Sequence, residues 1–177
     1  MEAALSASID PATGTFLIDT PRTCGGFAEG GAHTAGALRF DLAVSGEAQN
    51  TPASVWASSL DGEPLATSRR ILVTHLTDVQ NTGIEYADPD RTTLLKWGRL
   101  PHLMRNGAAE IELTVEGGSE ATPPSFAVYR LSPGGKRLGK VPFNLAVSGE
   151  AQNTLRFTAL IDYDPTTATY LYEIVRQ

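Results

Sequence analysis

The chain has 177 residues, enough for one domain with a substantial core, and 41% of them are hydrophobic. Its 14 Lys and Arg against 20 Asp and Glu give a formal net charge of −6, which argues against a nucleic-acid binder and against a polybasic membrane-surface protein. No apolar run approaches the roughly 18 residues of a membrane-spanning helix. The first ten residues have neither a basic region nor a long apolar stretch, so no signal peptide is expected in this chain.

Cysteine and histidine are scarce. The single cysteine, Cys24, excludes a disulfide framework and a cysteine-built zinc site. The three histidines, His33, His75 and His102, are too widely separated for a metal-binding motif. We expect Cys24 to be a small buried side chain and His75, inside the most apolar segment, to be a hydrogen-bonded core residue. No cofactor is therefore expected.

Strand-like segments recur along the chain, whereas no window of a dozen residues sustains helical spacing of apolar positions without Gly or Pro. Within residues 108–116, Ile111 and Leu113 alternate with Glu110 and Glu112, which is typical of a sheet with one face on the core and one in water. In chain order, the predicted strands cover residues 14–19, 37–44, 53–60, 70–79, 108–116, 125–131, 155–162 and 169–176.

This pattern predicts an all-β fold, an antiparallel β-sandwich of about eight or nine strands and of jelly-roll or immunoglobulin-like type, with a closed barrel as the alternative. Residues 71–79 are apolar on both faces, so a central strand covered on both sides is expected. Asp61-Gly62 predicts a two-residue hairpin turn. No linker rich in Pro, Gly or Ser divides the chain, so we expect a single domain over residues 1–177, in which residues 1–8 form a loose N-terminal segment.

One segment occurs twice: residues 40–51 and 143–154 differ only at Asp41 against Asn144. Each copy is predicted to form a strand that runs into a polar turn. The similarity stops on both sides of each copy, which excludes a two-repeat solenoid. Duplication of a strand–turn unit is one explanation, and two equivalent polar loops that bind one extended ligand are the other. The polar residues of these loops are Glu47, Gln49, Asn50, Glu150, Gln152 and Asn153.

Three longer segments follow one another along the chain: GTFLIDTPRT at 14–23, SSLDGEPLATSRRILVTHLTDVQNTG at 58–83 and WGRLPHLMRNG at 97–107. Together with the closing LYEI at 171–174, they resemble a module near the C-terminus of large bacterial glycoside-hydrolase-like polypeptides, where it follows a (β/α)8 catalytic barrel. The resemblance extends from Ile9 to Val175 and does not include the duplicated segment. It implies a non-catalytic β-sandwich accessory module in polysaccharide degradation, secreted or at the cell surface if it is part of a larger protein.

Catalysis within this chain is the less favoured hypothesis. A glycosidase requires two carboxyl groups about 5 to 10 Å apart, and the chain has no G-x-S-x-G nucleophile motif. Asp88 and Asp90 could offer oxygen ligands to Ca²⁺, although the spacing of an EF-hand is absent. The candidate carboxylate pairs are Asp61 with Glu63, Glu85 with Asp88 and Asp90, and Glu110 with Glu112.

Sugar-binding sandwiches present flat aromatic rings to pyranose faces, with polar side chains nearby. Phe16 and Trp56 lie in predicted strands and are expected in the core. Trp97, in a loop-like stretch, is the best candidate for an exposed ring. We therefore predict a carbohydrate-binding module whose ligand is a polysaccharide or oligosaccharide, and the alternative is a structural module that braces an adjacent glycoside hydrolase catalytic domain without binding sugar. The predicted sugar contacts are Trp97, Tyr86, Arg99 and His102.

Overall fold

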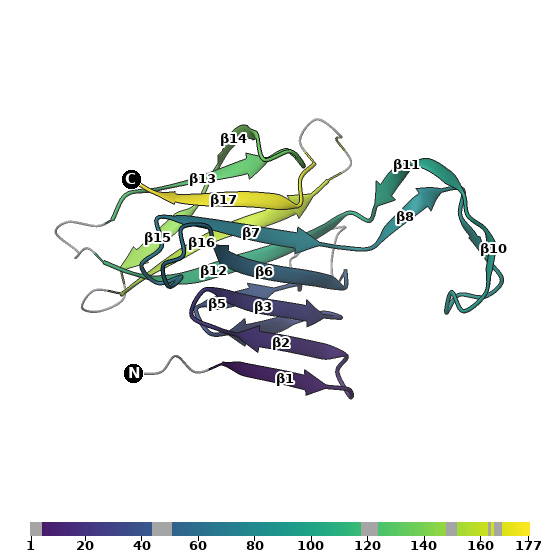
Figure 1. Ribbon diagram of the computed structural model, residues 1–177, viewed down its shortest axis with the longest axis horizontal. Helices are drawn as coiled ribbons and strands as arrows, with labels where there is room; N and C mark the ends of the chain where they lie inside the picture. The colour runs from purple at the N-terminus through teal and green to yellow at the C-terminus, as the bar shows by residue number, and fades with distance from the viewer. Residues whose placement is uncertain (1–4, 44–50, 118–123, 148–151, 163, 165–167) are drawn as a thin grey trace.

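The computed structural model describes residues 5–43, 51–117, 124–147, 152–162, 164 and 168–177. Within these ranges the chain is all β and contains no helix (Figure 1). Two antiparallel sheets face each other, so the predicted antiparallel β-sandwich is confirmed. Nothing in the described ranges has the length and apolar character of a membrane-spanning helix.

The described residues form a larger sheet of eight strands and a smaller sheet of five. The larger sheet has the order β1 (Ser6–Asp10), β2 (Thr15–Asp19), β3 (Thr23–Ala28), β6 (Ala53–Ser59), β7 (Arg70–Leu76), β17 (Leu171–Arg176), β13 (Phe126–Leu131) and β14 (Arg137–Val141). The smaller sheet has the order β15 (Asn144–Val147), β16 (Gln152–Ile161), β12 (Gly107–Glu116), β5 (Leu38–Asp41) and β4 (Ala32–Ala35).

The core lies between the sheets and is built from the inward positions of both. In β6, Val55 and Ala57 are buried, whereas Ser54 and Trp56 beside them are partly exposed. This period of two gives each sheet an inner and an outer face. The largest fully buried side chains include Leu38, Phe40, Val55, Ile71, Ile111, Leu113, Leu155, Tyr172 and Ile174.

Each of the eight predicted segments contains a strand, but the sequence pattern does not predict β3. Gly25 and Gly26 at its centre are unfavourable in a strand. Both are required by close backbone approach, since a Cβ on Gly25 would overlap the Val55 carbonyl and a Cβ on Gly26 would overlap the Phe16 carbonyl. The glycines therefore let β3 pair with β2 and β6 on its two sides.

The N-terminal segment is ordered where it is described. Ser6, Ala7 and Ser8 belong to β1 and pair with β2 in antiparallel register, so this part of the segment expected to be loose is an edge strand. Every residue of β1 is exposed. The described chain places no strand on the other side of β1, which is one edge of the larger sheet.

The central segment 70–79 differs from its prediction. It contributes β7, which lies inside the larger sheet as expected, but the strand ends at Leu76. The expectation that it is covered on both faces is wrong, because the side chains on its outer face are not buried: Leu72 and Thr74 are partly exposed, and Leu76 is exposed. Its outer face therefore remains open in the described structure.

The motif around Asp61 is also built differently from its prediction. The two-residue hairpin expected at Asp61-Gly62 is wrong, because residues 60–69 connect β6 to β7. Leu65, in the middle of this connection, is buried in the core, and its amide donates a hydrogen bond of 2.7 Å to the Pro21 carbonyl. Two of the segments that carry the family resemblance thus meet at one corner of the sandwich.

The two copies of the duplicated segment occupy different places. The first begins in β5 of the smaller sheet, and its last residue, Thr51, precedes β6 of the larger sheet. The second forms β15 and the beginning of β16 within the smaller sheet. The predicted strand is present in both copies, but most of the polar turn lies in residues 44–50 and 148–151, outside the described residues.

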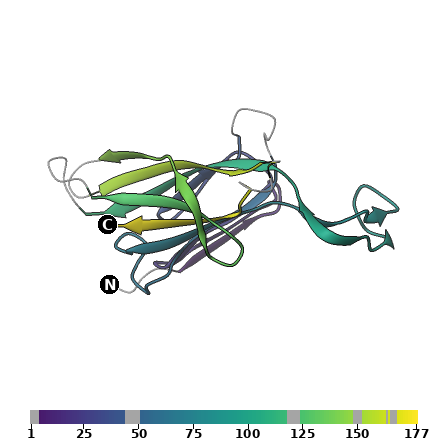
Figure 2. The same ribbon diagram turned by 90° about the horizontal axis from the view of Figure 1, so that it is seen from above.

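Between β7 and β12 the chain leaves the sandwich and forms a projecting arm, defined as residues 77–106 (Figures 1 and 2). In the arm, β8 (Val79–Thr82) pairs with β11 (Arg99–Met104), and β9 (Glu85–Tyr86) pairs with β10 (Leu94–Lys96). No residue of the arm is buried, and none belongs to the core cluster.

Candidate functional site

The arm exposes an unusual set of large apolar side chains. Trp97 is 76% exposed, Leu100 71% and Leu95 65%, and Leu103 and Val79 are also exposed. A single exposed leucine needs no explanation, but several on one narrow element mark a contact surface. We call these five residues the apolar surface of the arm; it includes both faces of the β8–β11 pair, because Val79 is opposite Met104 and Leu103 is opposite Gln80.

All four predicted sugar contacts lie on this arm, at different positions along it. Tyr86 is in β9 opposite Leu94, Trp97 directly follows β10, and Arg99 and His102 are in β11. All four residues come from one contiguous stretch of the chain, residues 86–102, which the fold places outside the sandwich. Trp97 and His102 are exposed, whereas Tyr86 is only partly exposed.

Asn81 of β8 links two of these residues. Its Nδ2 donates a hydrogen bond of 2.9 Å to the Trp97 carbonyl, and its Oδ1 is 2.8 Å from His102 Nδ1. The Thr82 hydroxyl donates to the Pro101 carbonyl at 2.8 Å. Side chains on β8 thus position the backbone on both sides of Gly98, while the indole of Trp97 remains free to contact a ligand or another protein.

An ion pair links the loop between β9 and β10 to the base of the arm. The Arg91 guanidinium donates to both carboxylate oxygens of Asp78, at 3.0 and 2.6 Å, and Arg105 approaches the same carboxylate at 3.7 Å. The hydrogen bonds from Arg91 hold the pKa of Asp78 below its usual value. The Arg91 guanidinium also lies over the Tyr86 ring, 5.9 Å from its centroid. One face of the Tyr86 ring is therefore in contact with Arg91 of the same arm.

The two aspartates considered for calcium lie in the loop between β9 and β10. Asp88 accepts hydrogen bonds from the Thr92 amide at 3.0 Å and from the Thr92 hydroxyl at 2.7 Å, and these bonds lower its pKa. Asp88 therefore caps a turn, while Asp90 is exposed. Within the described ranges, no three His, Cys, Asp or Glu side chains are grouped closely enough to form a metal site.

A cleft of about 330 Å³ opens on the arm near the sandwich. It combines amide, carboxylate and guanidinium groups with apolar side chains, and none of the four predicted sugar contacts lines it. A sugar held there would have no aromatic ring to stack on. Its lining residues are Asp78, Gln80, Asn81, Gly83, Ile84, Leu103, Met104 and Arg105.

The candidate carboxylate pairs of the sandwich are engaged in structural interactions. Glu112 lies between Arg39 at 2.8 Å and Arg156 at 2.6 Å, and Glu110 is 3.7 Å from Arg156. These residues form an ion-pair ladder on the outer face of the smaller sheet. Both carboxylates are therefore engaged by arginine side chains of neighbouring strands, as in a structural ion-pair network.

Asp61, the carboxylate of the most distinctive motif, closes the corner loop. Its Oδ2 accepts a hydrogen bond from the Arg69 amide at 2.7 Å, and its Oδ1 accepts from the Ser68 and Ser59 hydroxyls, each at 2.8 Å. These bonds hold the pKa of Asp61 well below its usual range. The geometry supports the structural role expected for this motif.

The buried Cys24 and His75 do not form a reactive site. Cys24 is fully buried, as expected, and burial raises the pKa of its thiol to about 11. His75 is fully buried, but neither ring nitrogen has a hydrogen-bond partner among the described residues, so the expected hydrogen bond is wrong. His33 contacts the Gly30 carbonyl at 2.7 Å.

The described part of the duplicated segment shows one polar side chain turned inward. Asn153 is buried and donates through Nδ2 to the Gly117 carbonyl, whereas Gln152 beside it is exposed. Asn153 is therefore unsuited to the ligand-binding loop considered from the sequence. Glu47, Gln49, Asn50 and Glu150 lie outside the described residues.

Sequence reasoning did not identify the aliphatic part of the arm's apolar surface. Val79, Leu95, Leu100 and Leu103 lie in a stretch without clean alternation, so no pattern separates exposed from buried positions. The only available signal was apolar residues mixed with turn residues in WGRLPHLMRNG.

Comparisons with protein-family models, curated proteins and solved structures found no match.

Proposed function

We propose that the chain is a non-catalytic accessory module that packs against another folded protein domain through the apolar surface of its arm. The observation that carries this proposal is the arm itself, where Trp97, Leu100 and Leu95 are all more than 60% exposed while no arm residue is buried. The resemblance stated above suggests a glycoside hydrolase catalytic barrel as that domain.

The composition of the arm favours a protein over a glycan as its partner. Four of the five residues in its apolar surface are aliphatic, and one, Trp97, is aromatic. Aliphatic side chains gain free energy mainly by leaving water, at about 25 cal/mol for each Å² buried, which an apolar protein surface supplies. Pyranose recognition depends instead on aromatic faces flanked by hydrogen-bonding groups.

The stability of the arm gives a second argument. An isolated two-stranded hairpin is only marginally stable in water, and this one has no core of its own. Polar contacts such as Asp78 with Arg91 keep its shape without burying its apolar residues. An element that is pre-shaped but not covered is suited to bind a partner with little ordering cost.

Carbohydrate binding through Trp97 is the second candidate, and one observation favours it. The indole is 76% exposed, and the Trp97 backbone is hydrogen-bonded to Asn81, which in turn contacts His102, so two side chains that can hydrogen-bond hydroxyl groups belong to the same part of the arm. This arrangement would suit a single sugar ring stacked on Trp97. Arg99 in the same strand would be a further contact.

A binding assay with arm variants tests the main proposal. A (β/α)8 catalytic barrel from a polypeptide with the same module order is titrated with the labelled chain, and anisotropy is recorded. The double variant Trp97→Ser, Leu100→Ser should weaken binding at least tenfold, since about 1.4 kcal/mol suffices for that change. The matched control is Leu138→Ser in β14, a leucine that is 47% exposed on the sandwich.

Equal binding by the double variant and the parent chain would contradict the proposal, because the arm would then not be in the contact. Affinity electrophoresis in gels containing xylan, laminarin, pectin or cellulose derivatives addresses the second candidate. Retardation of the parent chain that is lost in Trp97→Ala would support carbohydrate binding. An unretarded parent chain would exclude it for the polysaccharides tested.

A further inference from the structure

The outer face of the larger sheet is divided into two chemically different halves. On the strands β1, β2, β3, β6 and β7, the outward positions hold a group of large apolar side chains, and we call this group the apolar half-face. Its residues are Ile9, Phe16, Ile18, Phe27, Trp56 and Leu76.

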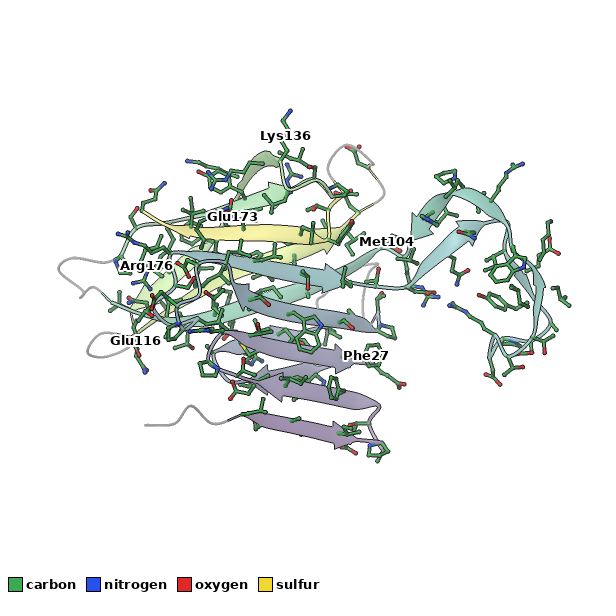
Figure 3. The ribbon with its side chains drawn as sticks, in the orientation of Figure 1. Phe27, Met104, Glu116, Lys136, Glu173 and Arg176 are labelled. Carbon is green, nitrogen blue, oxygen red and sulfur yellow. The ribbon has the colours of Figure 1, made fainter. Side chains whose placement is uncertain are left out.

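The strand registers place these side chains side by side. Ile9 is opposite Phe16, and Phe16 is opposite Phe27. The Phe16 and Trp56 rings contact each other, with centroids 6.4 Å apart. Figure 3 shows Phe27 at the end of β3 nearest the arm. Six apolar side chains from neighbouring strands thus form one continuous surface.

The other half of the same outer face is charged. On β17, Glu173 receives hydrogen bonds from Arg70 and Arg137, each with a closest approach of 2.6 Å. Arg137 also lies over the Tyr129 ring at 4.3 Å. By contrast, the outward positions of β2, β3 and β6 contain no charged residue. Among the five strands of the apolar half-face, only β7 has a charged outward residue, Arg70, which lies at the opposite end of that strand from Leu76 and pairs with Glu173.

We propose that the apolar half-face pairs with the same face of a second copy of this chain, as a reversible, isologous dimer. The inference concerns a different surface from the arm and does not rest on the arm's role. Two copies that each carry a charge of −6 repel each other, so self-association requires a contact surface without like charges. The apolar half-face satisfies this requirement.

The shape of the apolar half-face is also suited to contact with a second copy of the same face. Gly25 lies between Ile18 and Trp56 across the strands, and Ser54 lies between Phe27 and Leu76. Large side chains therefore alternate with small ones, and two such sheets can interdigitate as the faces of a β-sandwich do. A twofold axis parallel to the strands, through the middle of this half, leaves the two charged halves on opposite flanks, so the contact closes after two copies.

A glycan fits this face poorly. The planes of Phe16 and Trp56 are inclined by 59°, so the rings do not form a flat platform. The small outward residues beside these rings, Ser54, Gly25 and Thr74, offer at most a hydroxyl group each. Sugar hydroxyls buried there would lose hydrogen bonds to water without replacement.

The size of the face indicates a weak dimer. Five strands of five to seven residues, spaced about 4.8 Å apart, give a footprint of roughly 500 Å². Stable interfaces usually bury about 800 Å² on each partner. The dimer should therefore dissociate on dilution.

Sedimentation velocity of the full chain, from about 5 to 500 µM, tests the proposal. The weight-average mass should rise from monomer towards dimer. Ser54→Lys and Phe27→Lys should each weaken association at least tenfold, because a lysine buried in this contact has no partner. Thr158→Lys, an exposed position on β16, is the matched control and should leave association unchanged.

Fluorescence locates the contact. In the variant Trp97→Phe, Trp56 is the remaining tryptophan, and its quenching by acrylamide should fall as the dimer forms. A chain that stays monomeric at every concentration would overturn the proposal. A dimer unaffected by Ser54→Lys and Phe27→Lys would overturn it as well. So would a dimer abolished by Leu100→Ser, since the arm would then mediate association.

Discussion

The arm and the sandwich use polar and apolar residues in opposite ways. In the sandwich, apolar side chains are buried between the sheets, and the buried carboxylate of Glu173 is paired with two arginines. In the arm, the polar pair Asp78 and Arg91 closes the structure, and the apolar side chains point into solvent. The difference separates residues that maintain the fold from residues that are available for binding.

The largest expected effect contrasts a core residue with an arm residue. Ile111 in β12 is fully buried, so Ile111→Ala should cost about 3 to 4 kcal/mol of unfolding free energy through lost burial and a residual cavity. Leu100→Ala on the arm should change stability by less than about 0.5 kcal/mol. Urea unfolding measures both. A comparable loss in Leu100→Ala would show that the arm contributes to the core after all.

Acid should weaken the sandwich through His75. Burial lowers the pKa of His75 from 6.5 to about 4, so between these values the unfolded chain binds a proton that the folded chain does not. Stability should therefore fall as the pH falls from about 6.5 to 4, by on the order of 3 kcal/mol. Urea unfolding across this range measures the fall.

Two variants isolate the contribution of His75. His75→Leu should remove this part of the pH dependence, because leucine has no titratable group. The substitution breaks no hydrogen bond, since neither ring nitrogen of His75 has a partner in the described structure. His102→Gln, on the exposed arm, is the matched control and should keep the dependence of the parent chain. A slope between pH 6.5 and 4 that survives in His75→Leu would assign it to another group.

The next effect concerns the ion-pair group on the larger sheet. Burial raises the pKa of Glu173, but hydrogen bonds from Arg137 and Arg70 outweigh it and keep the pKa below 4.5. Glu173→Gln should cost about 1 to 2 kcal/mol, because the two arginines stay partly solvated. The carboxylate stabilises the fold above about pH 4.5 and loses this effect as the pH falls below that value. Equal stability of variant and parent at pH 7 would contradict the assignment.

The smallest change in global stability is expected for Asp78→Asn. It removes the charge that Arg91 and Arg105 share at the base of the arm. Amide exchange in β11 should accelerate several-fold, while the unfolding free energy of the whole chain changes by less than about 0.5 kcal/mol. Hydrogen–deuterium exchange resolves the two effects. Unchanged exchange in β11 would mean that the backbone pairing alone maintains the arm.

The sequence predicts some elements of this fold well because they alternate cleanly. The strand around Ile111 and Leu113 places its glutamates outward, as expected, since burial and pairing act on the same period of two. The sequence pattern does not predict β3, because glycine has a low strand propensity. Gly25 and Gly26 are present because neighbouring backbones approach too closely for any side chain. Such a contact lies between residues distant in the sequence.

The candidate site is predictable only in part. Trp97 is exposed as expected, because its neighbours are turn and charged residues. The expectation that Trp56 and Phe16 are in the core is wrong: Trp56 is on the outer face of β6, whose buried face is the one of Val55 and Ala57, and Phe16 is on the outer face of β2, opposite Phe27. A strand with apolar residues on both faces does not reveal which face is covered.

By itself, the sequence determined the class of this protein: an acidic all-β chain with one cysteine, three scattered histidines and alternating strands. Turn residues and the alternation of strand side chains depend on neighbouring residues in the sequence, so both can be recognised without a structure. Only the tertiary structure decided that residues 77–106 leave the sandwich as an arm and that half of the larger sheet presents apolar residues to solvent. Both depend on which surfaces other parts of the chain cover, and coverage is a property of the whole fold.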